Sequence, residues 1–312
     1  MGNRLNLGDF KKRADAISWV AVLCHVSLVL TPVFLAAWIG PGVYWIAFWL
    51  WFGLLMSGLL NLMHECAHFH AFQKRQGSDL LGHWLLGPLA LADFEGYRQR
   101  HWKHHTHLGV DGDTKDAYLV DIHGWQLPSV FLQCLSLQMA VRKFHVQVEP
   151  KASQEVATPR PKPWIERTIA VQGMFFLCLL VAAGPAAGRR IWPQGLLVAI
   201  AAYTCVYLYG LASLTVFAAT LRAIAEHQLE PGQHFETGRA ALRNFQCGPI
   251  SWLIFGAYGF AEHATHHREP GLPYYHLPKA TAQLAAENVE FARSGLYWTE
   301  LLTLATGREK HP

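Results

Sequence analysis

Four long runs of apolar residues divide the chain. Residues 17–39, 43–63, 164–184 and 195–221 are almost free of charged side chains, and each is long enough to cross the hydrocarbon core of a bilayer, which needs about 20 residues. Short turns, at residues 40–42 and 184–193, join the runs in pairs. The pattern therefore predicts an all-α integral membrane protein with four transmembrane helices in two hairpins.

Two further apolar stretches, residues 80–91 and 249–260, are too short to cross. We expect both to lie in the interface or to be re-entrant. Residues 125–148 are expected to form a surface-lying amphipathic segment, and residues 149–163 a polar, proline-rich loop. The tail, residues 279–312, is polar and is expected to contain a short amphipathic helix.

The fourth run is unusually long. As a helix, residues 195–221 would measure about 40 Å, more than the hydrocarbon core. We therefore expect this helix to leave the bilayer while still helical and to carry Arg222, Glu226 and His227 beyond it.

Composition agrees with one membrane-embedded unit. The chain has 312 residues, of which 52% are hydrophobic and only 15% charged, against about a quarter charged in soluble domains. We therefore treat residues 1–312 as a single domain. No Lys/Arg cluster is interleaved with aromatic residues, which argues against a nucleic-acid surface. The net charge of +4 fits a protein that faces anionic lipid headgroups.

Charge also predicts the orientation. The turns on one side of the four spans contain only Arg189 and Arg190, and the other basic residues lie mostly on the side of the termini. Positive charge is retained in the cytoplasm, so we expect the termini, and the histidine-rich segments beside them, to be cytoplasmic.

Histidines recur at helical spacings next to the predicted spans. HECAH, HWKHH and HATHH each place their histidines three or four residues apart, and one more histidine follows the fourth span. On a helix such residues share one face. Neutral imidazole is the commonest protein metal ligand, and this set is too large for one tetrahedral zinc ion. The pattern therefore favours two metal ions that share a histidine cap. His25, inside the first span with no partner box, is expected to be a packed residue.

This set, with PGLPYYHLP after the last box, resembles the membrane fatty-acid desaturase and hydroxylase family over roughly residues 20–280. The resemblance implies a non-haem di-iron enzyme that uses dioxygen to attack an unactivated C–H bond. Redox-inert zinc would not support such chemistry, although imidazole ligands alone do not select iron. Matched position by position, the implied ligands are His64, His68, His101, His104, His105, His227, His263, His266 and His267.

The resemblance favours desaturation of a long-chain fatty acyl substrate, because that is the family's commonest activity. Hydroxylation and oxidative decarboxylation to a terminal alkene remain open on the same scaffold, as do free acid, thioester and lipid as the substrate carrier. Electrons are expected from a separate donor, either ferredoxin-like or a small haem protein with its reductase.

Five carboxylates lie near the histidines. Glu65, Glu226 and Glu262 each adjoin a predicted ligand, and acidic neighbours often orient ligating imidazoles. A role as solvated charges is the alternative for these three. Asp111 and Asp113 are interpreted as turn residues and not as ligands.

Four other polar residues stand beside the boxes. His70 and His107 are more readily surface residues or neighbours of the ligands than ligands themselves. Arg98 and Lys103 could meet an anionic substrate head, but a plain surface role is favoured.

Two rival functions match part of this pattern. HECAH also matches the H-E-x-x-H signature of zinc proteases, in which His64 and His68 would bind zinc and Glu65 would act as base. That reading leaves the other boxes unused. A metal transporter or sensor would place its ligands near the bilayer midplane, whereas these boxes lie at the ends of the spans.

Overall fold

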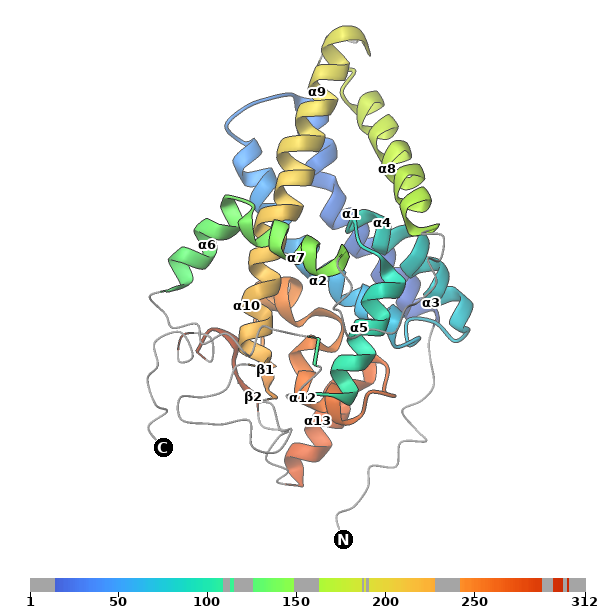
Figure 1. Cartoon of the computed structure of the whole chain (residues 1–312), viewed down its shortest axis with the longest axis vertical. Coiled ribbons are helices and arrows are strands. Elements are labelled where there is room, and N and C mark those ends of the chain that lie inside the picture. The colour runs from blue at the N-terminus through green and yellow to red at the C-terminus, as the bar shows by residue number, and fades with distance from the viewer. Residues whose placement is uncertain are drawn as a thin grey trace.

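Four long helices form the body of the molecule (Figure 1). The computed structural model describes residues 15–108, 113–114, 126–148, 163–186, 188, 191–227, 242–287, 294–299 and 302. Within this part of the chain, four helices are long and apolar enough to cross a membrane. They are α1 (Asp15–Ile39), α2 (Trp45–Ala67), α8 (Pro163–Ala182) and the helix Pro193–His227. The predicted all-α membrane architecture is confirmed.

The first hairpin is formed by α1 and α2. Gly40 closes it in the left-handed region at φ +92°, a conformation that costs glycine little. The second helix continues past the predicted boundary at residue 63 to Ala67, so His64 lies within the helix. Gly58 of α2 lies against the Leu253 carbonyl, and this close approach brings the C-terminal segment onto the first hairpin.

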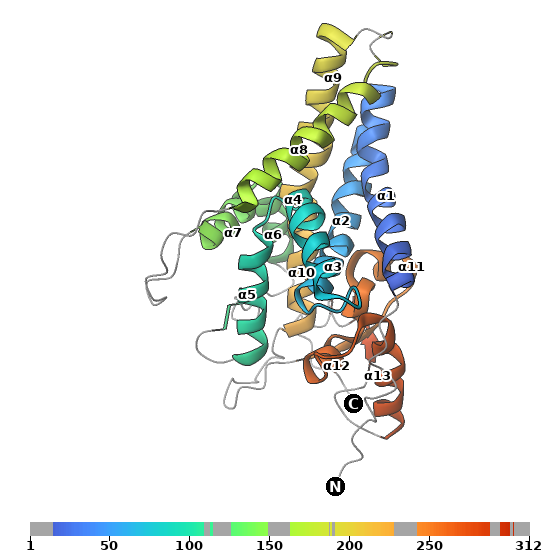
Figure 2. The same ribbon diagram turned by 90° about the vertical axis from the view of Figure 1, so that its right-hand side faces the viewer.

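The second hairpin consists of α8 and the helix Pro193–His227. That helix contains α9 (Leu196–Ala201), π-helical turns at Ala202–Leu208 and Leu211–Thr215, and α10 (Val216–His227). In Figure 2, α8 runs obliquely to the other three long helices. The fourth helix stays helical through Glu226 and His227, as its length predicted, and α10 reaches the lower part of the molecule in Figure 1.

A segment of short helices links the first hairpin to the second histidine box. It comprises α3 (Arg75–Leu81), a π-helical turn (Gly82–Leu86) and α4 (Gly87–Leu89), and leads into α5 (Phe94–Thr106). Gln172 Nε2 donates to the Pro88 carbonyl at 2.8 Å, and the Tyr207 hydroxyl donates to the Leu89 carbonyl at 2.7 Å. These donors satisfy buried carbonyls where the helix ends, as buried backbone groups require.

Residues 127–148 form two helices and not one segment. α6 (Leu127–Leu135) and α7 (Gln138–Val148) are separated at Leu137, where φ is +64°. Both contact the fourth helix, because the Tyr209 hydroxyl donates to the Leu135 carbonyl and Lys143 Nζ donates to Thr220. Of the loop predicted at residues 149–163, residues 149–162 lie outside the described residues.

The C-terminal part covers the histidine-bearing ends of the long helices. A short parallel pair, β1 (Asn244–Gln246) and β2 (Ser294–Leu296), was not predicted. The stretch between them contains α11 (Pro249–Ser251), two short helical turns (Trp252–Gly256 and Ala257–Glu262), α12 (His263–Arg268), a 3₁₀ turn (Tyr274–His276) and α13 (Leu277–Ala286). Figures 1 and 2 both place α5, the end of α10, α12 and α13 together at one end of the molecule.

Candidate metal centre

Four helices deliver the nine predicted ligands to one place. The last turn of α2 carries His64, His68 caps the end of that helix, and the end of α10 carries His227. The remaining six are divided between α5 and α12. Seven of the nine side chains are buried, and those of His105 and His267 are partly exposed. The structure thus brings together every histidine that the sequence pattern selected.

One cluster contains five histidines, and their ring nitrogens lie within 4.8 Å of one another. The Nε2 atoms of His68 and His101 are 2.8 Å apart, and His105 Nε2 lies 3.0 Å from His101 Nε2. His266 Nε2 approaches His105 Nε2 at 3.2 Å. The members of this first cluster are His64, His68, His101, His105 and His266.

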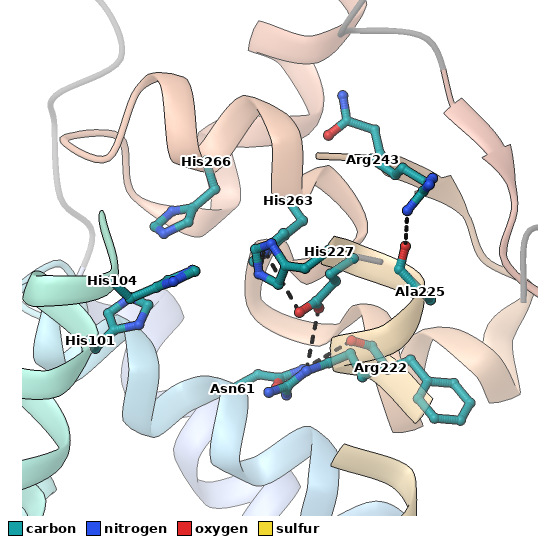
Figure 3. Close-up of polar contacts among 12 residues, drawn as sticks. Asn61, His101, His104, Arg222, Ala225, His227, Arg243, His263 and His266 are labelled. Atoms are coloured by element: carbon teal, nitrogen blue, oxygen red, sulfur yellow. Dashed lines mark hydrogen bonds and ion pairs between the residues drawn. The ribbon is translucent and has the colours of Figure 1, made fainter. Parts of the chain in front are cut away.

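A second cluster adjoins the first. His104, His227 and His267 form a group with nitrogens within 4.8 Å, and His263 Nε2 lies 2.9 Å from His227 Nε2. The ring of His105, from the first cluster, stacks on that of His267 with centroids 4.2 Å apart. Figure 3 shows His263 and His227 side by side, with His104 and His101 across from them. The histidines thus form two adjoining groups, called here the two nests. The first nest is the first cluster, and the second consists of His104, His227, His263 and His267.

The donor set fits metal ions. Buried Nε2 atoms of His64 and His267 have no hydrogen-bond partner among the described residues, although buried polar atoms normally have one. Burial lowers the pKa of His267 well below its ordinary value, with further lowering by neighbouring imidazoles. A neutral imidazole offers a lone pair from one nitrogen. Several such lone pairs meeting in each nest could hold one metal ion there.

Three buried carboxylates surround the nests. Asp113 accepts a hydrogen bond from His104 Nδ1 at 2.9 Å, Glu65 lies 3.3 Å from His64 Nδ1, and Glu226 lies 3.7 Å from His263 Nε2. Contacts at Nδ1, as made by Asp113 and Glu65, fix the orientation of a ligating imidazole. Glu226 instead approaches Nε2 and forms, with His227 and His263, a group that could itself hold a metal ion. The three carboxylates would also offset the positive charge of bound metal ions.

Two of these carboxylates were anticipated and one was missed. Glu65 and Glu226 adjoin ligands in the sequence. Asp113 was interpreted as a turn residue, and its partner His104 lies nine positions earlier in the chain. Burial raises the pKa of Glu262 to about 7, but no contact of its side chain with a predicted ligand is recorded among the described residues. Asp111 lies outside the described residues.

The other histidines have separate environments. His25 is buried, and its ring nitrogens lie 2.9 Å from the Tyr258 hydroxyl and 3.2 Å from the Leu55 carbonyl, so it is a packed residue, as predicted. His70 stacks on His68 with centroids 5.8 Å apart and belongs to neither nest. His107 is exposed, and its Nδ1 lies 3.2 Å from the Lys103 carbonyl.

Arg98 does not have the surface role that the sequence favoured. Its side chain is buried, pairs with Asp79 and with Glu95 at 2.9 Å, and packs over the Phe94 ring. Arg98 therefore ties α5 to α3. Lys103 is partly exposed on α5.

Comparison with known proteins shows which family the chain belongs to. The chain matches the family model described as fatty acid desaturase over residues 43–301. An sn-1 oleoyl-lipid 12-desaturase of Synechocystis sp. is 24% identical over 260 residues, covering 76% of this chain and 67% of that protein. A sphingolipid delta(4)-desaturase/C4-monooxygenase of Homo sapiens is 25% identical over 291 residues, covering 88% and 77% respectively. An oleoyl-12-hydroxylase of Ricinus communis is 31% identical over 67 residues, covering 22% and 17%. The chain is an oxidoreductase of the membrane and belongs to the fatty acid desaturase family.

Proposed function

We propose that the two histidine nests hold two iron ions. The observation that carries this proposal is the convergence of nine histidines from four helices into two adjoining groups. The first ion would be held by His64, His68, His101, His105 and His266, and the second by His104, His227, His263 and His267. Bound iron would supply the activation of dioxygen that oxidation of an unactivated C–H bond requires. A zinc-protease role for His64 and His68 would leave the other seven histidines without a purpose.

The proposed reaction is desaturation of a long acyl chain. Its balance takes two hydrogens from neighbouring carbons, with two electrons from a donor protein and two protons, and reduces one dioxygen to two waters. The matched relatives include two that are named as desaturases, which supports this choice. The hydroxylase among them and the C4-monooxygenase activity in another relative's name keep hydroxylation as the alternative, together with oxidative decarboxylation.

The protein's own residues would position and neutralise this centre. Asp113 and Glu65 would hold imidazoles in place, and together with Glu226 they would offset the charge of the ions. Apolar packing on the membrane side would exclude water from the reacting carbon, which strengthens electrostatic interactions inside the site.

The remaining parts of the proposal concern the surroundings. The bilayer would supply the apolar substrate, and a separate ferredoxin-like or small haem protein, served by a reductase, would supply electrons. The metal centre and both termini would face the cytoplasm, on the basis of the charge distribution. The whole chain, residues 1–312, would act as one catalytic unit.

Product analysis tests the reaction. The chain is expressed in a bacterial host with a ferredoxin partner, beside a His104→Ala variant, and total fatty acids, free acids and headspace volatiles are profiled by mass spectrometry. Acids that have lost two hydrogens, formed only with the intact chain, are the expected result. A gain of oxygen would identify a hydroxylase, and a shortened terminal alkene a decarboxylase. Identical profiles for both proteins would contradict an acyl-chain oxidation.

A further inference from the structure

A layer of polar side chains lies between the histidine nests and the membrane-spanning part of the helices. Asn61, Tyr97 and Arg222 precede His64, His101 and His227 by three, four and five residues on their helices. At 1.5 Å per residue, these offsets are about 4 to 8 Å along the helix axes. For a substrate that entered from the bilayer, this layer would be next to the reacting carbon.

The centre of the layer is the guanidinium of Arg222. Arg222 Nη1 donates to Asn61 Oδ1, and Nε lies 3.3 Å from Glu226 Oε1 (Figure 3). Only 14% of the side chain is exposed. Within the described residues these contacts use Nη1 and Nε, and no acceptor contacts Nη2. A guanidinium has five N–H donors, so Arg222 retains capacity for another acceptor.

Asn61 is held rigidly in this arrangement. Its side chain is fully buried, and its amide nitrogen donates to the carbonyls of Phe255 and Ala257, both at 3.1 Å. The amide oxygen therefore faces Arg222. Because the position of Asn61 is fixed by backbone groups, the guanidinium is oriented before any ligand binds, which reduces the cost of binding.

Arg222 is also close to the histidines. The guanidinium lies over the Phe260 ring at 4.3 Å, and the same ring contacts His64 with ring centroids 4.6 Å apart. Glu226, the ion-pair partner of Arg222, lies 3.7 Å from His263 Nε2. Arg222 is thus linked to His64 of the first nest through the Phe260 ring, and to His263 of the second nest through the Glu226 carboxylate.

Tyr97 adds a further donor to the layer. Its ring stacks on His101 with centroids 5.8 Å apart. Its hydroxyl can donate one hydrogen bond.

The polar and charged side chains of this layer would not stabilise the apolar methylene groups in the middle of an acyl chain. A buried cation beside the reaction site costs free energy unless a group that binds it compensates. The carboxylate of Glu226 would not compensate Arg222 fully, because metal ions held at His263 would attract the same carboxylate. A planar guanidinium matches a carboxylate in geometry and charge.

We propose that Arg222, oriented by Asn61, binds the carboxylate of a free long-chain fatty acid, so that oxidation occurs near the carboxyl end of the chain. The inference deepens the proposed function and rests on it for the oxidation, but the carboxylate site itself is testable without turnover.

The test measures binding to the full-length, iron-loaded protein in detergent. The probes are radiolabelled hexadecanoic acid, its methyl ester and hexadecanol. We expect the acid to bind at least about tenfold more tightly than the ester or alcohol, since charge-assisted hydrogen bonds have that strength. In Arg222→Gln this preference disappears while binding of the ester is retained, and Arg222→Lys keeps part of it. Arg167→Gln, which removes a basic side chain that packs over Trp84 in the turn Gly82–Leu86, keeps the full preference.

Two results would overturn the carboxylate site. Equal binding of acid and ester by the unaltered protein excludes it without use of any variant. A full acid preference in a folded Arg222→Gln protein shows that Arg222 only supports Glu226 and Asn61. If Arg222→Gln does not fold, binding of the acid, ester and alcohol is compared between the unaltered protein and Arg222→Lys. An acid preference that is the same in both proteins would contradict a role of Arg222 in binding the carboxylate.

Turnover separates this inference from the proposed function. Iron content and any dioxygen-dependent oxidation of an acyl substrate test the proposed function. Products altered within the first few carbons of a free acid support both ideas. Products altered only in mid-chain, or only on esterified substrates, leave the proposed function standing and contradict the inference. Absence of oxidation together with an acid preference removes the proposed function but keeps the carboxylate site.

Discussion

At the scale of single residues, His267 and His107 differ in burial and partners although both belong to histidine-rich stretches. His267 stacks on His105 and has a buried, unpartnered Nε2 among the described residues, whereas His107 is exposed. His267→Ala is expected to lower activity at least about 100-fold and to reduce bound iron, because a lost ligand costs at least as much as a lost orienting partner. His107→Ala should keep both within about twofold. Elemental analysis and turnover assays of the two variants check this, and normal iron content in His267→Ala would remove it from the ligand set.

Asp113 provides a second test at the same scale. Its carboxylate accepts a hydrogen bond from His104 Nδ1 at 2.9 Å and so orients Nε2 toward the second cluster. Asp113→Asn preserves the size of the side chain but removes its negative charge. The expected loss of iron affinity or activity is about 10- to 100-fold. Competition with a chelator measures the affinity. Unchanged affinity would mean that Asp113 is only a turn residue, as the sequence pattern suggested.

The sequence could predict contacts within one helix but not contacts between segments that are distant in the chain. Spacings of three and four residues on one helix are local, so the faces of HECAH, HWKHH and HATHH were readable directly. The contact between His104 and Asp113 depends on how the chain leaves α5, which no local pattern specifies. The same applies to Arg98, whose partner Asp79 lies nineteen residues away on α3.

At the scale of elements, the packing of α2 against the C-terminal segment determines whether the third histidine box reaches the first. A Cβ at Gly58 would overlap the Leu253 carbonyl oxygen, whereas a Cβ at Gly173 of α8 would meet nothing within 4 Å. Small residues allow such close approach between membrane helices.

Gly58→Ala is therefore expected to destabilise the fold by about 1–3 kcal/mol and to reduce iron content, because residues 252–267 would shift away from α2. Gly173→Ala should change stability by no more than about 1 kcal/mol. Thermal unfolding in detergent, with iron analysis of each variant, compares them. Equal behaviour of the two variants would show that the contact at Gly58 does not determine the position of the third box.

Element boundaries were predictable where length and hydropathy decide them. The predicted spans differ from the helices by a few residues, and the fourth helix continues to His227 as its length required. The break of residues 127–148 at Leu137 and the pairing of β1 with β2 were not predicted. Both depend on contacts with distant segments and not on a local hydrophobic period.

At the scale of the whole molecule, the described ends of α2, α5, α10 and α12 meet at one end of the body (Figures 1 and 2). Two hairpins require the chain to return to the same side after each pair of spans, and this explains how histidines separated by about 200 residues can share one centre. The proposed electron donor is restricted by the same geometry, since it must dock on the side of the membrane where the nests lie.

Orientation can therefore be tested together with function. Positive charge is concentrated on the histidine-bearing side, and the opposite turns contain only Arg189 and Arg190, so the positive-inside rule predicts a cytoplasmic centre. A green fluorescent protein fused after Pro312 should fluoresce in a bacterial host, and alkaline phosphatase fused there should be inactive. Phosphatase inserted after Pro41, in the turn of the first hairpin, should be active. The reverse pattern would place the nests outside the cytoplasm, where soluble cytoplasmic ferredoxins could not reach them, and would require a different electron donor.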